Sequence, residues 1–347
     1  MTIDVLDCTL RDGGYQNAWD FPDELVGKYL RALEATGCRY VEMGYRACAT
    51  DSLAGRYRYS PDHLLKSHCS GLGLTVAVMI DGKALCDAKG SVDPIRLETM
   101  FCARDQSPVH LVRIAATVEI VKPASAMCGW LRERGYEVSI NLMQASTLEV
   151  SSIRRAARHL NESGANLVYL ADSFGGLTPG ATMTRTGALA SSFHGRVGFH
   201  AHDNMGLAFA NTIAAIGAGA TIVDSSVLGM GRGAGNLRTE QLLQYLETTG
   251  RSRVTAAPLF DLVATEFAQL HAQHGWGPRL PYLMTGAYNI HPTYAQTLLR
   301  DPGTGASEVV GTLQVLSADP ERSTFSAATL GAAMTSAGAA VRRRRIG

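Results

Sequence analysis

The feature that most constrains the fold is a regular alternation of short apolar segments with longer amphipathic ones. Runs rich in β-branched and apolar residues recur at intervals of about 30 residues, and segments with helical periodicity lie between them. Such alternation predicts a parallel sheet built from strand–helix units. Eight units within about 250 residues favour a closed (β/α)8 TIM barrel over an open doubly wound sheet. We expect strands at 3–9, 39–44, 74–80, 109–115, 137–143, 167–171, 197–201 and 221–227, and helices at 23–36, 147–163 and 207–216.

The alternation of apolar strands and amphipathic helices ends near residue 250, which predicts two regions. Residues 1–250 would form the catalytic barrel, and residues 255–347 a helical C-terminal region. Within the second region we expect helices at 258–274, at 282–299 with Pro292 inside it, and at 326–340.

Several functional classes are excluded by what the sequence lacks. No Gly-x-Gly-x-x-Gly follows the first strand and no P-loop motif occurs, which removes the usual dinucleotide and nucleotide sites. The 32 basic and 31 acidic residues balance, so nucleic acid is not an expected partner. No apolar run approaches the roughly 18 residues that span a bilayer, and the N-terminus shows no secretory signal, so we expect no membrane association and a cytoplasmic location. Seven cysteines without a CxxC pair predict reduced thiols.

Candidate metal ligands lie where the barrel strands are expected to end, which is where TIM barrels carry their active sites. His200 and His202 are two residues apart, so on a strand their imidazoles share one face. Asp12, expected at the end of strand one, can add a carboxylate, and Asn236 an amide oxygen. This oxygen and nitrogen set, without thiolate, favours Mn2+, with Mg2+, Co2+ and Zn2+ as alternatives. The competing interpretation is that the histidines are hydrogen-bonded residues lining the barrel.

Arg11 would place a permanent cation beside this metal. A metal ion and an arginine together can receive a 2-oxo acid, the arginine stabilising the enolate formed when a carbon–carbon bond breaks. The alternative is an ion pair between Arg11 and Asp12 or Glu42. Glu42, at the expected end of strand two, is a candidate to support the metal and substrate site.

These motifs together resemble the metal-dependent barrel lyases and synthases that carry a TLRDG motif. That superfamily includes 3-hydroxy-3-methylglutaryl-CoA lyase, isopropylmalate synthase and 4-hydroxy-2-oxovalerate aldolase. The matching segments are TLRDG at 9–13, HAHDN at 200–204 and GMGRGAGN at 229–236. VRIA at 112–115 and YLADSFG at 169–175 look like the aldolase branch, and the order of motifs agrees over residues 3–247.

The resemblance implies a role for each matched residue. Asp12, His200 and His202 would be metal ligands, Asn236 would match a metal-ligating asparagine, and Arg11 would stabilise the enolate. Ser173 would contact the oxo acid, as would Arg113 within its matched segment. TGAY at 285–288 resembles the C-terminal helices of the aldolase more loosely, and places Tyr288 near a tyrosine of that active site.

One departure from the aldolase pattern concerns the catalytic base. The aldolase motif continues with Met-His, and that histidine is its proposed base, whereas here Gly14 and Tyr15 follow. Three residues could replace it: Tyr15, if nearby cations lower its pKa from about 10, Tyr288, and His291. Plain alternatives are packing for Tyr15 and a capping or loop hydrogen bond for His291.

The sequence therefore predicts a divalent-metal-dependent class II aldolase acting on a 4-hydroxy-2-oxo acid, pyruvate and an aldehyde through a metal-bound enolate. One rival is a Claisen-type synthase joining an acyl-CoA to a 2-oxo acid, and another is a non-catalytic metal-binding partner subunit. Self-association through the helical region is expected. The resemblance also allows an aldehyde dehydrogenase partner.

Overall fold

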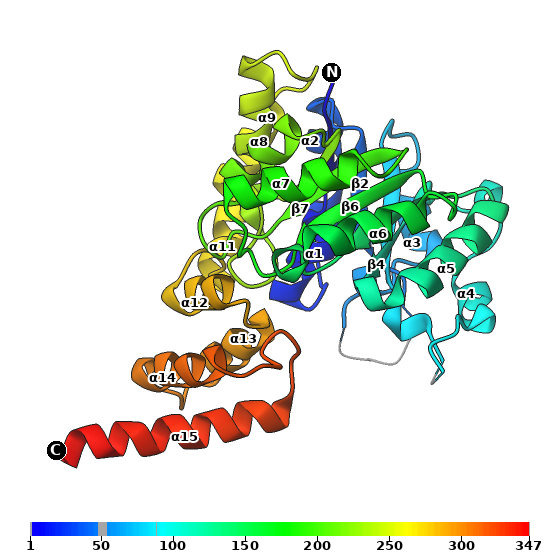
Figure 1. Ribbon diagram of the computed structural model, residues 1–347. Helices are drawn as coiled ribbons and strands as arrows, with labels where there is room; N and C mark the ends of the chain where they lie inside the picture. Colours follow the sequence, from blue (N-terminus) through cyan, green and yellow to red (C-terminus); the bar gives the residue numbers. More distant parts are fainter. Residues whose placement is uncertain (1, 48–53, 88, 347) are drawn as a thin grey trace.

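The computed structural model describes residues 2–47, 54–87 and 89–346, with side chains as far as Gly338. Eight parallel strands close into a barrel in sequence order, because β8 pairs with β1 from Asp4↔Ile222 to Asp7↔Ser225 (Figure 1). The predicted TIM barrel is thus confirmed. The strands are β1 Asp4–Asp7, β2 Tyr40–Tyr45, β3 Thr75–Asp81, β4 Leu111–Ala116, β5 Glu137–Leu142, β6 Leu167–Asp172, β7 Arg196–Ala201 and β8 Ile222–Ser225.

Helices surround the strands, and the main hydrophobic core lies between the two layers. Local capping starts some of them: the Thr178 side chain accepts the Ala181 N–H ahead of a proline at the first turn of α7. The barrel helices are α1 Thr9–Asn17, α2 Asp23–Ala35, α3 Asp62–Cys69, α4 Pro94–Met100, α5 Val121–Glu133, α6 Val150–Leu160, α7 Pro179–Ala190, α8 Ala208–Gly217 and α9 Thr239–Thr248.

The barrel interior is filled in layers by alternate residues of each strand. An apolar layer at the N-terminal end includes Tyr40, Leu111, Leu167 and Ile222. Two residues further along the strands the interior becomes charged, with Glu42, Arg113 and Asp224 each at most 1 % exposed. A third layer, at the C-terminal end, carries His200. The polar interior therefore begins one layer below the barrel mouth.

Strand one is shorter than the sequence suggested. We expected a strand over 3–9 with Arg11 and Asp12 at its end, but β1 stops at Asp7 and both residues lie in helix α1. The Asp7 carboxylate accepts hydrogen bonds from the N–H and hydroxyl of Thr9, at 2.9 and 2.5 Å. This satisfies a free donor at the start of the helix. The turn carries Arg11 and Asp12 over the barrel mouth.

The C-terminal region has two parts. A short π-helical segment, Val263–Phe267, joins α10 Ala257–Leu262 to α11 Ala268–His274. Both α-helices pack on the barrel core. The remaining helices form a second core to one side of the barrel (Figure 1). They are α12 Leu280–Tyr288, α13 Pro292–Arg300, α14 Ala306–Ser317 and α15 Ala327–Ile346. The predicted boundary at 250–255 stays a prediction. Residues as far along the chain as Trp276 belong to the barrel core, and the second core combines residues of the later helices with Ala234.

The single helix expected over 282–299 is two helices. The α12 helix ends with Asn289 in a left-handed conformation, φ 53°, and His291 then caps α13 at its first residue, Pro292. Proline is favoured at that position because it has no N–H to satisfy. Helix α12 rests on the barrel mouth, where Thr285 accepts a hydrogen bond from Asn204 at 3.0 Å. None of the described helices is long and apolar enough to cross a membrane.

Candidate active site

A small cavity of about 90 Å³ opens at the C-terminal ends of the strands. One part of its wall is polar and carries both histidines with Asp12. The other part is apolar and aromatic, with Met79, Ala115 and Met143 among its residues. The wall consists of Arg11, Asp12, Tyr15, Tyr45, Met79, Ala115, Asn141, Met143, Ala171, Ser173, His200, His202 and Arg232.

Three predicted metal ligands meet at this cavity. One ligand atom each from Asp12, His200 and His202 lies within 4.8 Å of the others, and all three residues are buried. The two imidazole rings project from the end of β7 with centroids 5.0 Å apart. Burial lowers the pKa of His202 to about 3, so its ring is neutral and can donate a lone pair to a metal. Burial alone would raise the pKa of Asp12, but the Arg11 guanidinium and the other basic side chains around the carboxylate together outweigh burial and hold that pKa well below its usual range.

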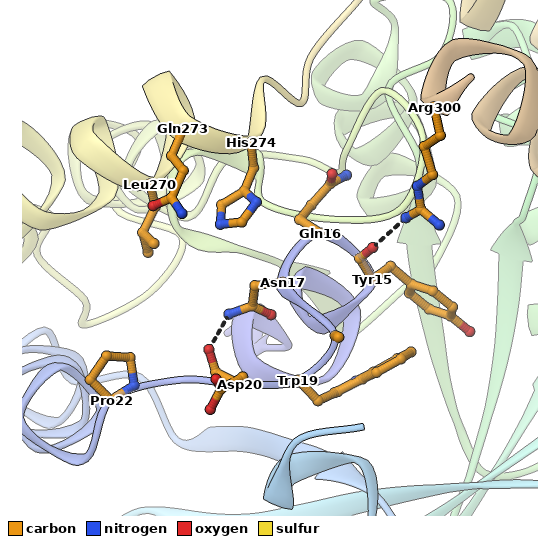
Figure 2. A pocket seen from close by; sticks show the side chains of 11 residues that line it. Tyr15, Gln16, Asn17, Trp19, Asp20, Pro22, Leu270, Gln273, His274 and Arg300 are labelled. Carbon is orange, nitrogen blue, oxygen red and sulfur yellow. Dashed lines mark hydrogen bonds between the residues drawn. The ribbon is translucent and has the colours of Figure 1, made fainter. Parts of the chain in front are cut away.

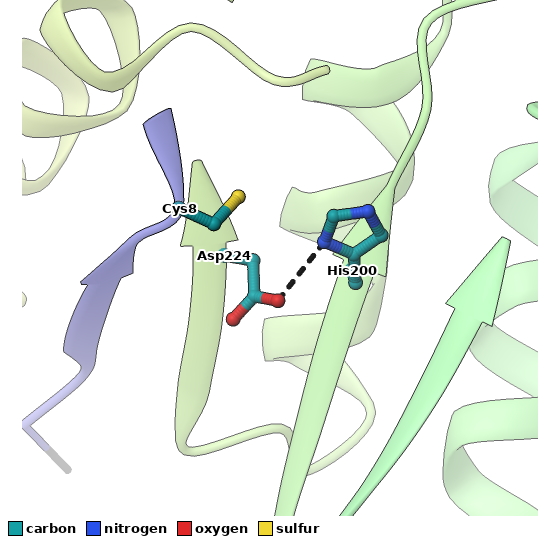
Figure 3. Close-up of side chains that lie close together, drawn as sticks. All are labelled: Cys8, His200 and Asp224. Atoms are coloured by element: carbon teal, nitrogen blue, oxygen red, sulfur yellow. Dashed lines mark hydrogen bonds and ion pairs between the residues drawn. The ribbon is translucent and has the colours of Figure 1, made fainter. Parts of the chain in front are cut away.

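Each histidine is oriented through its Nδ1 atom. His200 Nδ1 lies 2.9 Å from Oδ2 of Asp224 (Figure 3), and His202 Nδ1 lies 3.3 Å from the carbonyl oxygen of Gly235. Partners of this kind fix the tautomer of a metal-binding histidine and direct Nε2 toward the ion. Asp224 was not among the residues predicted from the sequence. A charged residue alternating with apolar ones in Ile222–Ser225 was the available signal, because it places the carboxylate inside the barrel.

A second group of possible metal ligands consists of Cys8, His200 and Asp224 (Figure 3). Burial raises the pKa of the Cys8 thiol well above its usual value. The thiol stays protonated and donates to the carbonyl of Ser225 at 3.2 Å. Within this group, the contact that orients His200 is the one between its Nδ1 and the Asp224 carboxylate. The six cysteines within the described residues are all free.

A continuous charged network supports the cavity from below. Arg11 donates to Asp12 at 2.5 Å and to Glu42 at 2.7 Å. Arg113 donates to the same Glu42 at 2.9 Å and to Asp224 at 2.5 Å. The ion pair offered above as the alternative for Arg11 is therefore present, and Arg11 also reaches the cavity wall. Arg113, expected to contact the oxo acid, and Glu42, the candidate support of the metal and substrate site, both lie beneath the wall, where they hold Arg11 and Asp224 in place.

Asn236 lies beside Asp12 and donates from Nδ2 to its Oδ2 at 2.6 Å. The Oδ1 atom of Asn236 is buried and has no hydrogen-bond partner among the described residues. The glycine-rich loop makes this contact close, because a Cβ atom on Gly231 would overlap the Asn236 amide and come within 2.9 Å of Asp12. Only glycine fits there without displacing both side chains.

The three candidate bases occupy different environments. Tyr15, on α1, lines the cavity, and its hydroxyl lies 3.0 Å from that of Tyr45. Tyr288 is 49 % exposed at the end of α12 and is not part of the cavity wall. His291 accepts the Thr293 N–H as the cap of α13, and burial lowers its pKa to about 3. The structure thus brings Tyr15 to the predicted ligands and leaves the other two outside the cavity.

Ser173, expected to contact the oxo acid, lines the cavity from the loop after β6, where its hydroxyl accepts the Gln144 N–H at 2.9 Å. Tyr45, Asn141 and Arg232 also line it and were not singled out from sequence. Burial raises the pKa of Tyr45 well above its usual value, so this phenol keeps its proton. For Arg232 the available signal was a charged residue inside a run of glycines.

A wider groove of about 830 Å³ lies beside the cavity, between the end of α1 and α11 (Figure 2). Tyr15 belongs to the wall of both hollows. Arg300 reaches across from α13 and donates to the main-chain carbonyl of Tyr15 at 3.2 Å. Tyr15 therefore separates the cavity from the groove.

The comparison with known families agrees with this geometry, since the profile of the HMGL-like family matches residues 2–267. The chain belongs to the HMGL-like family. A curated relative, the 4-hydroxy-2-oxovalerate aldolase of Pelotomaculum thermopropionicum, is 32 % identical over 256 residues, which are 72 % of this chain and 71 % of the relative. The resemblance inferred from the motifs is confirmed. With its aldolase relatives, this HMGL-like chain is an enzyme of the carbon–carbon lyase type.

Two further matches extend into the C-terminal region of this HMGL-like enzyme. The oxaloacetate decarboxylase of Mycobacterium tuberculosis is 27 % identical over 313 residues, or 88 % of this chain and 89 % of the relative. Among solved structures, the N-terminal domain of a candidate aldolase from Bacteroides vulgatus matches with a TM-score of 0.76 and 30 % identity. It covers 87 % of this chain and 98 % of that domain.

Proposed function

We propose that this chain is a divalent-metal-dependent class II aldolase that cleaves or forms a 4-hydroxy-2-oxo acid. One observation carries the proposal: Asp12, His200 and His202 converge at the barrel mouth with Arg11 beside them, in one cavity. Aldolase relatives at 32 % identity support the same reaction class.

The residues fit a hard divalent cation. Asp12 Oδ2 and the Nε2 atoms of the two oriented imidazoles would hold it, with the unpartnered Oδ1 of Asn236 as a fourth donor. This set of oxygen and nitrogen donors suits Mn2+ best, with Mg2+, Co2+ and Zn2+ as alternatives. When bound, such an ion supplies Lewis-acid polarisation of a carbonyl group.

Arg11 supplies the electrostatic part of the mechanism. Its guanidinium is held by Asp12 and Glu42, so it needs no rearrangement when negative charge develops on the C2 oxygen of the oxo acid. Breaking the C3–C4 bond leaves its electron pair on the pyruvate part as an enolate, which Arg11 stabilises until C3 takes a proton.

Tyr15 is the base that the geometry supports best. Its hydroxyl lies in the cavity wall, beside a Tyr45 hydroxyl that keeps its own proton. In the cleavage direction Tyr15 would act as the phenolate and take the proton of the 4-hydroxyl group, and the resulting phenol would return that proton when the reaction runs as a condensation. Tyr288 and His291 stay predictions without support from position.

Oxaloacetate decarboxylation is a second candidate, favoured by the relative that matches 88 % of the chain. There the C3–C4 bond breaks to release CO2, and no hydroxyl proton has to be removed first. Of the described cavity-lining residues, no histidine or lysine is available as a base besides the two proposed metal ligands, which agrees with this simpler chemistry.

Pyruvate release from the Mn2+-loaded enzyme, coupled to lactate dehydrogenase, distinguishes these candidates. We expect release from 4-hydroxy-2-oxo acids that is lost in Arg11→Ala and His200→Ala. Release from oxaloacetate alone would favour the decarboxylase. No release from either, with metal bound, would refute both and make acetyl-CoA condensation the next reaction to test. An aldehyde dehydrogenase partner and self-association stay predictions.

A further inference from the structure

Arg232 is the one charged group of the cavity wall that the proposed mechanism does not use. It lies in the loop after β8 and reaches across the mouth, where Nη2 donates to the carbonyl of Ser173 at 3.0 Å. Its guanidinium carbon lies 5.8 Å from the ring centroid of Tyr15. The side chain therefore spans from β8 to the loop after β6, at the rim of the cavity.

This guanidinium is incompletely satisfied. Its Nε atom is buried and has no hydrogen-bond partner among the described residues. Arg11 and Arg113 each contact two carboxylates, but no carboxylate in the described part of the chain forms an ion pair with Arg232. A buried donor without a partner is costly, so a ligand that supplies an acceptor there gains affinity.

Glycines flank Arg232 in the loop after β8. Gly231 before it leaves no room for a Cβ atom beside Asn236, and Gly233 after it has a left-handed φ of 67°. Both positions favour glycine, for different reasons. The Arg232 side chain is held by its hydrogen bond to Ser173 and its contact with the Tyr15 ring.

The two arginines of the cavity wall lie in different surroundings. Arg11, beside the proposed metal ligands, is held by the carboxylates of Asp12 and Glu42. Arg232, at the rim, is held by the main-chain carbonyl of Ser173 and has no carboxylate partner among the described residues. A ligand whose 2-oxo acid end lies at Arg11 can therefore place a second anionic group against Arg232, where a charge-assisted hydrogen bond would form.

We infer that Arg232 binds a second carboxylate of the substrate, so that the preferred substrate is a dianionic 4-hydroxy-2-oxo acid with a carboxylate on C4. This inference rests on the proposed function and narrows its substrate class. The oxo-acid head lies at the floor with Arg11 and the metal ligands, and the distal end of the molecule faces the rim. Cleavage breaks C3–C4: C4 loses its hydroxyl proton to become the carbonyl carbon of a carboxylate-bearing product, and C3 gains a proton to give pyruvate.

Binding of two unreactive probes tests the inference without relying on turnover. 2-Oxoglutarate lacks the 4-hydroxyl group and ends in a carboxylate, whereas 2-oxopentanoate has the same number of carbons and ends in a methyl group. Calorimetry on the Mn2+-loaded enzyme should show 2-oxoglutarate binding about 10- to 100-fold more tightly, the usual contribution of a charge-assisted hydrogen bond.

Three variants test whether Arg232 causes the tighter binding of 2-oxoglutarate. Arg232→Met should reduce it to less than about threefold while changing 2-oxopentanoate affinity little, and Arg232→Lys, which keeps the charge, should retain part of it. Arg300→Met is the matched control, because it removes an exposed guanidinium that contacts Tyr15 but does not line the cavity. It should keep the full preference.

Two results would overturn the inference: no preference in the unaltered enzyme, or equal weakening of both probes in Arg232→Met. Equal weakening would mean that Arg232 binds the carboxylate common to both probes. Failure of the proposed function has a different signature. The binding preference would then persist, but no 4-hydroxy-2-oxo acid of either charge would release pyruvate.

Discussion

The Asp224→Asn substitution tests whether the charged layer beneath the cavity both stabilises the barrel and positions a metal ligand. Asp224 Oδ2 accepts from Arg113 at 2.5 Å and lies 2.9 Å from His200 Nδ1, and neither carboxylate nor guanidinium is exposed. Asparagine keeps the size of the side chain and removes its charge. Two effects are expected from one substitution, on folding and on metal affinity.

The magnitudes follow from the partners that remain. Breaking a buried ion pair costs about 3–5 kcal/mol, because the remaining charge is left uncompensated. Arg113 keeps its bond to Glu42 at 2.9 Å, so we expect the lower end, about 3 kcal/mol, in the free energy of unfolding. Loss of the partner that orients His200 should weaken Mn2+ binding about 10- to 100-fold.

Urea unfolding and Mn2+ calorimetry at pH 7 measure these two effects. Asp4→Asn is the control, because Asp4 pairs with Arg196 at 2.6 Å but both side chains are partly exposed, at 24 % and 37 %. That substitution should cost less than about 1 kcal/mol and leave Mn2+ affinity unchanged. Equal, small effects of both substitutions would refute the view that this layer carries structural and ligand-orienting energy.

Three other predictions address the pH dependence, the loop and the base. Burial raises the pKa of the Asp172 carboxyl to about 6, above its unfolded value near 4. Between these pH values the folded state holds a proton that the unfolded state has lost, so the free energy of unfolding falls as pH rises through this range. Asp172→Asn should flatten that dependence in urea midpoints measured at pH 4.5, 6 and 7.5. Gly231→Ala should displace Asn236 and lower Mn2+ affinity at least about tenfold while far-UV circular dichroism stays unchanged, and unchanged affinity would contradict the close packing of the loop. Tyr15→Phe should lower kcat about 100-fold or more if its hydroxyl moves the proton, whereas Tyr45→Phe should lower kcat less than about tenfold. Equal losses of kcat would contradict the assignment of Tyr15 as the base.

The sequence predicted the barrel and placed His200 and His202 together at its mouth because both depend on local, periodic signals. Strand–helix alternation specifies the barrel, and the two-residue spacing of His200 and His202 places both rings on one face regardless of what packs around them. Strand one was predicted too long because the turn at Asp7 depends on hydrogen bonds to Thr9, and apolar periodicity does not report such bonds.

The parts that could not be predicted depend on contacts between distant segments. Asp224 orients His200 across 24 residues of sequence, and Arg232 meets Ser173 across 59. Helix α12 packs on loops that are distant in the sequence. Whether Tyr288 on that helix lines the cavity depends on this packing. Residue type and spacing carry no information about such pairings.

The Ala234 residue of the glycine-rich loop packs in the core of the C-terminal helices. On either side of it, Arg232 lines the cavity and Asn236 donates to Asp12. This short loop therefore connects the barrel mouth to the packing of the C-terminal helices. A shift of the helices, through a fused domain or an engineered contact, would be transmitted over two peptide bonds to the residues that receive the substrate. We therefore expect changes in the C-terminal helices to shift Arg232 without replacing any side chain of the cavity wall.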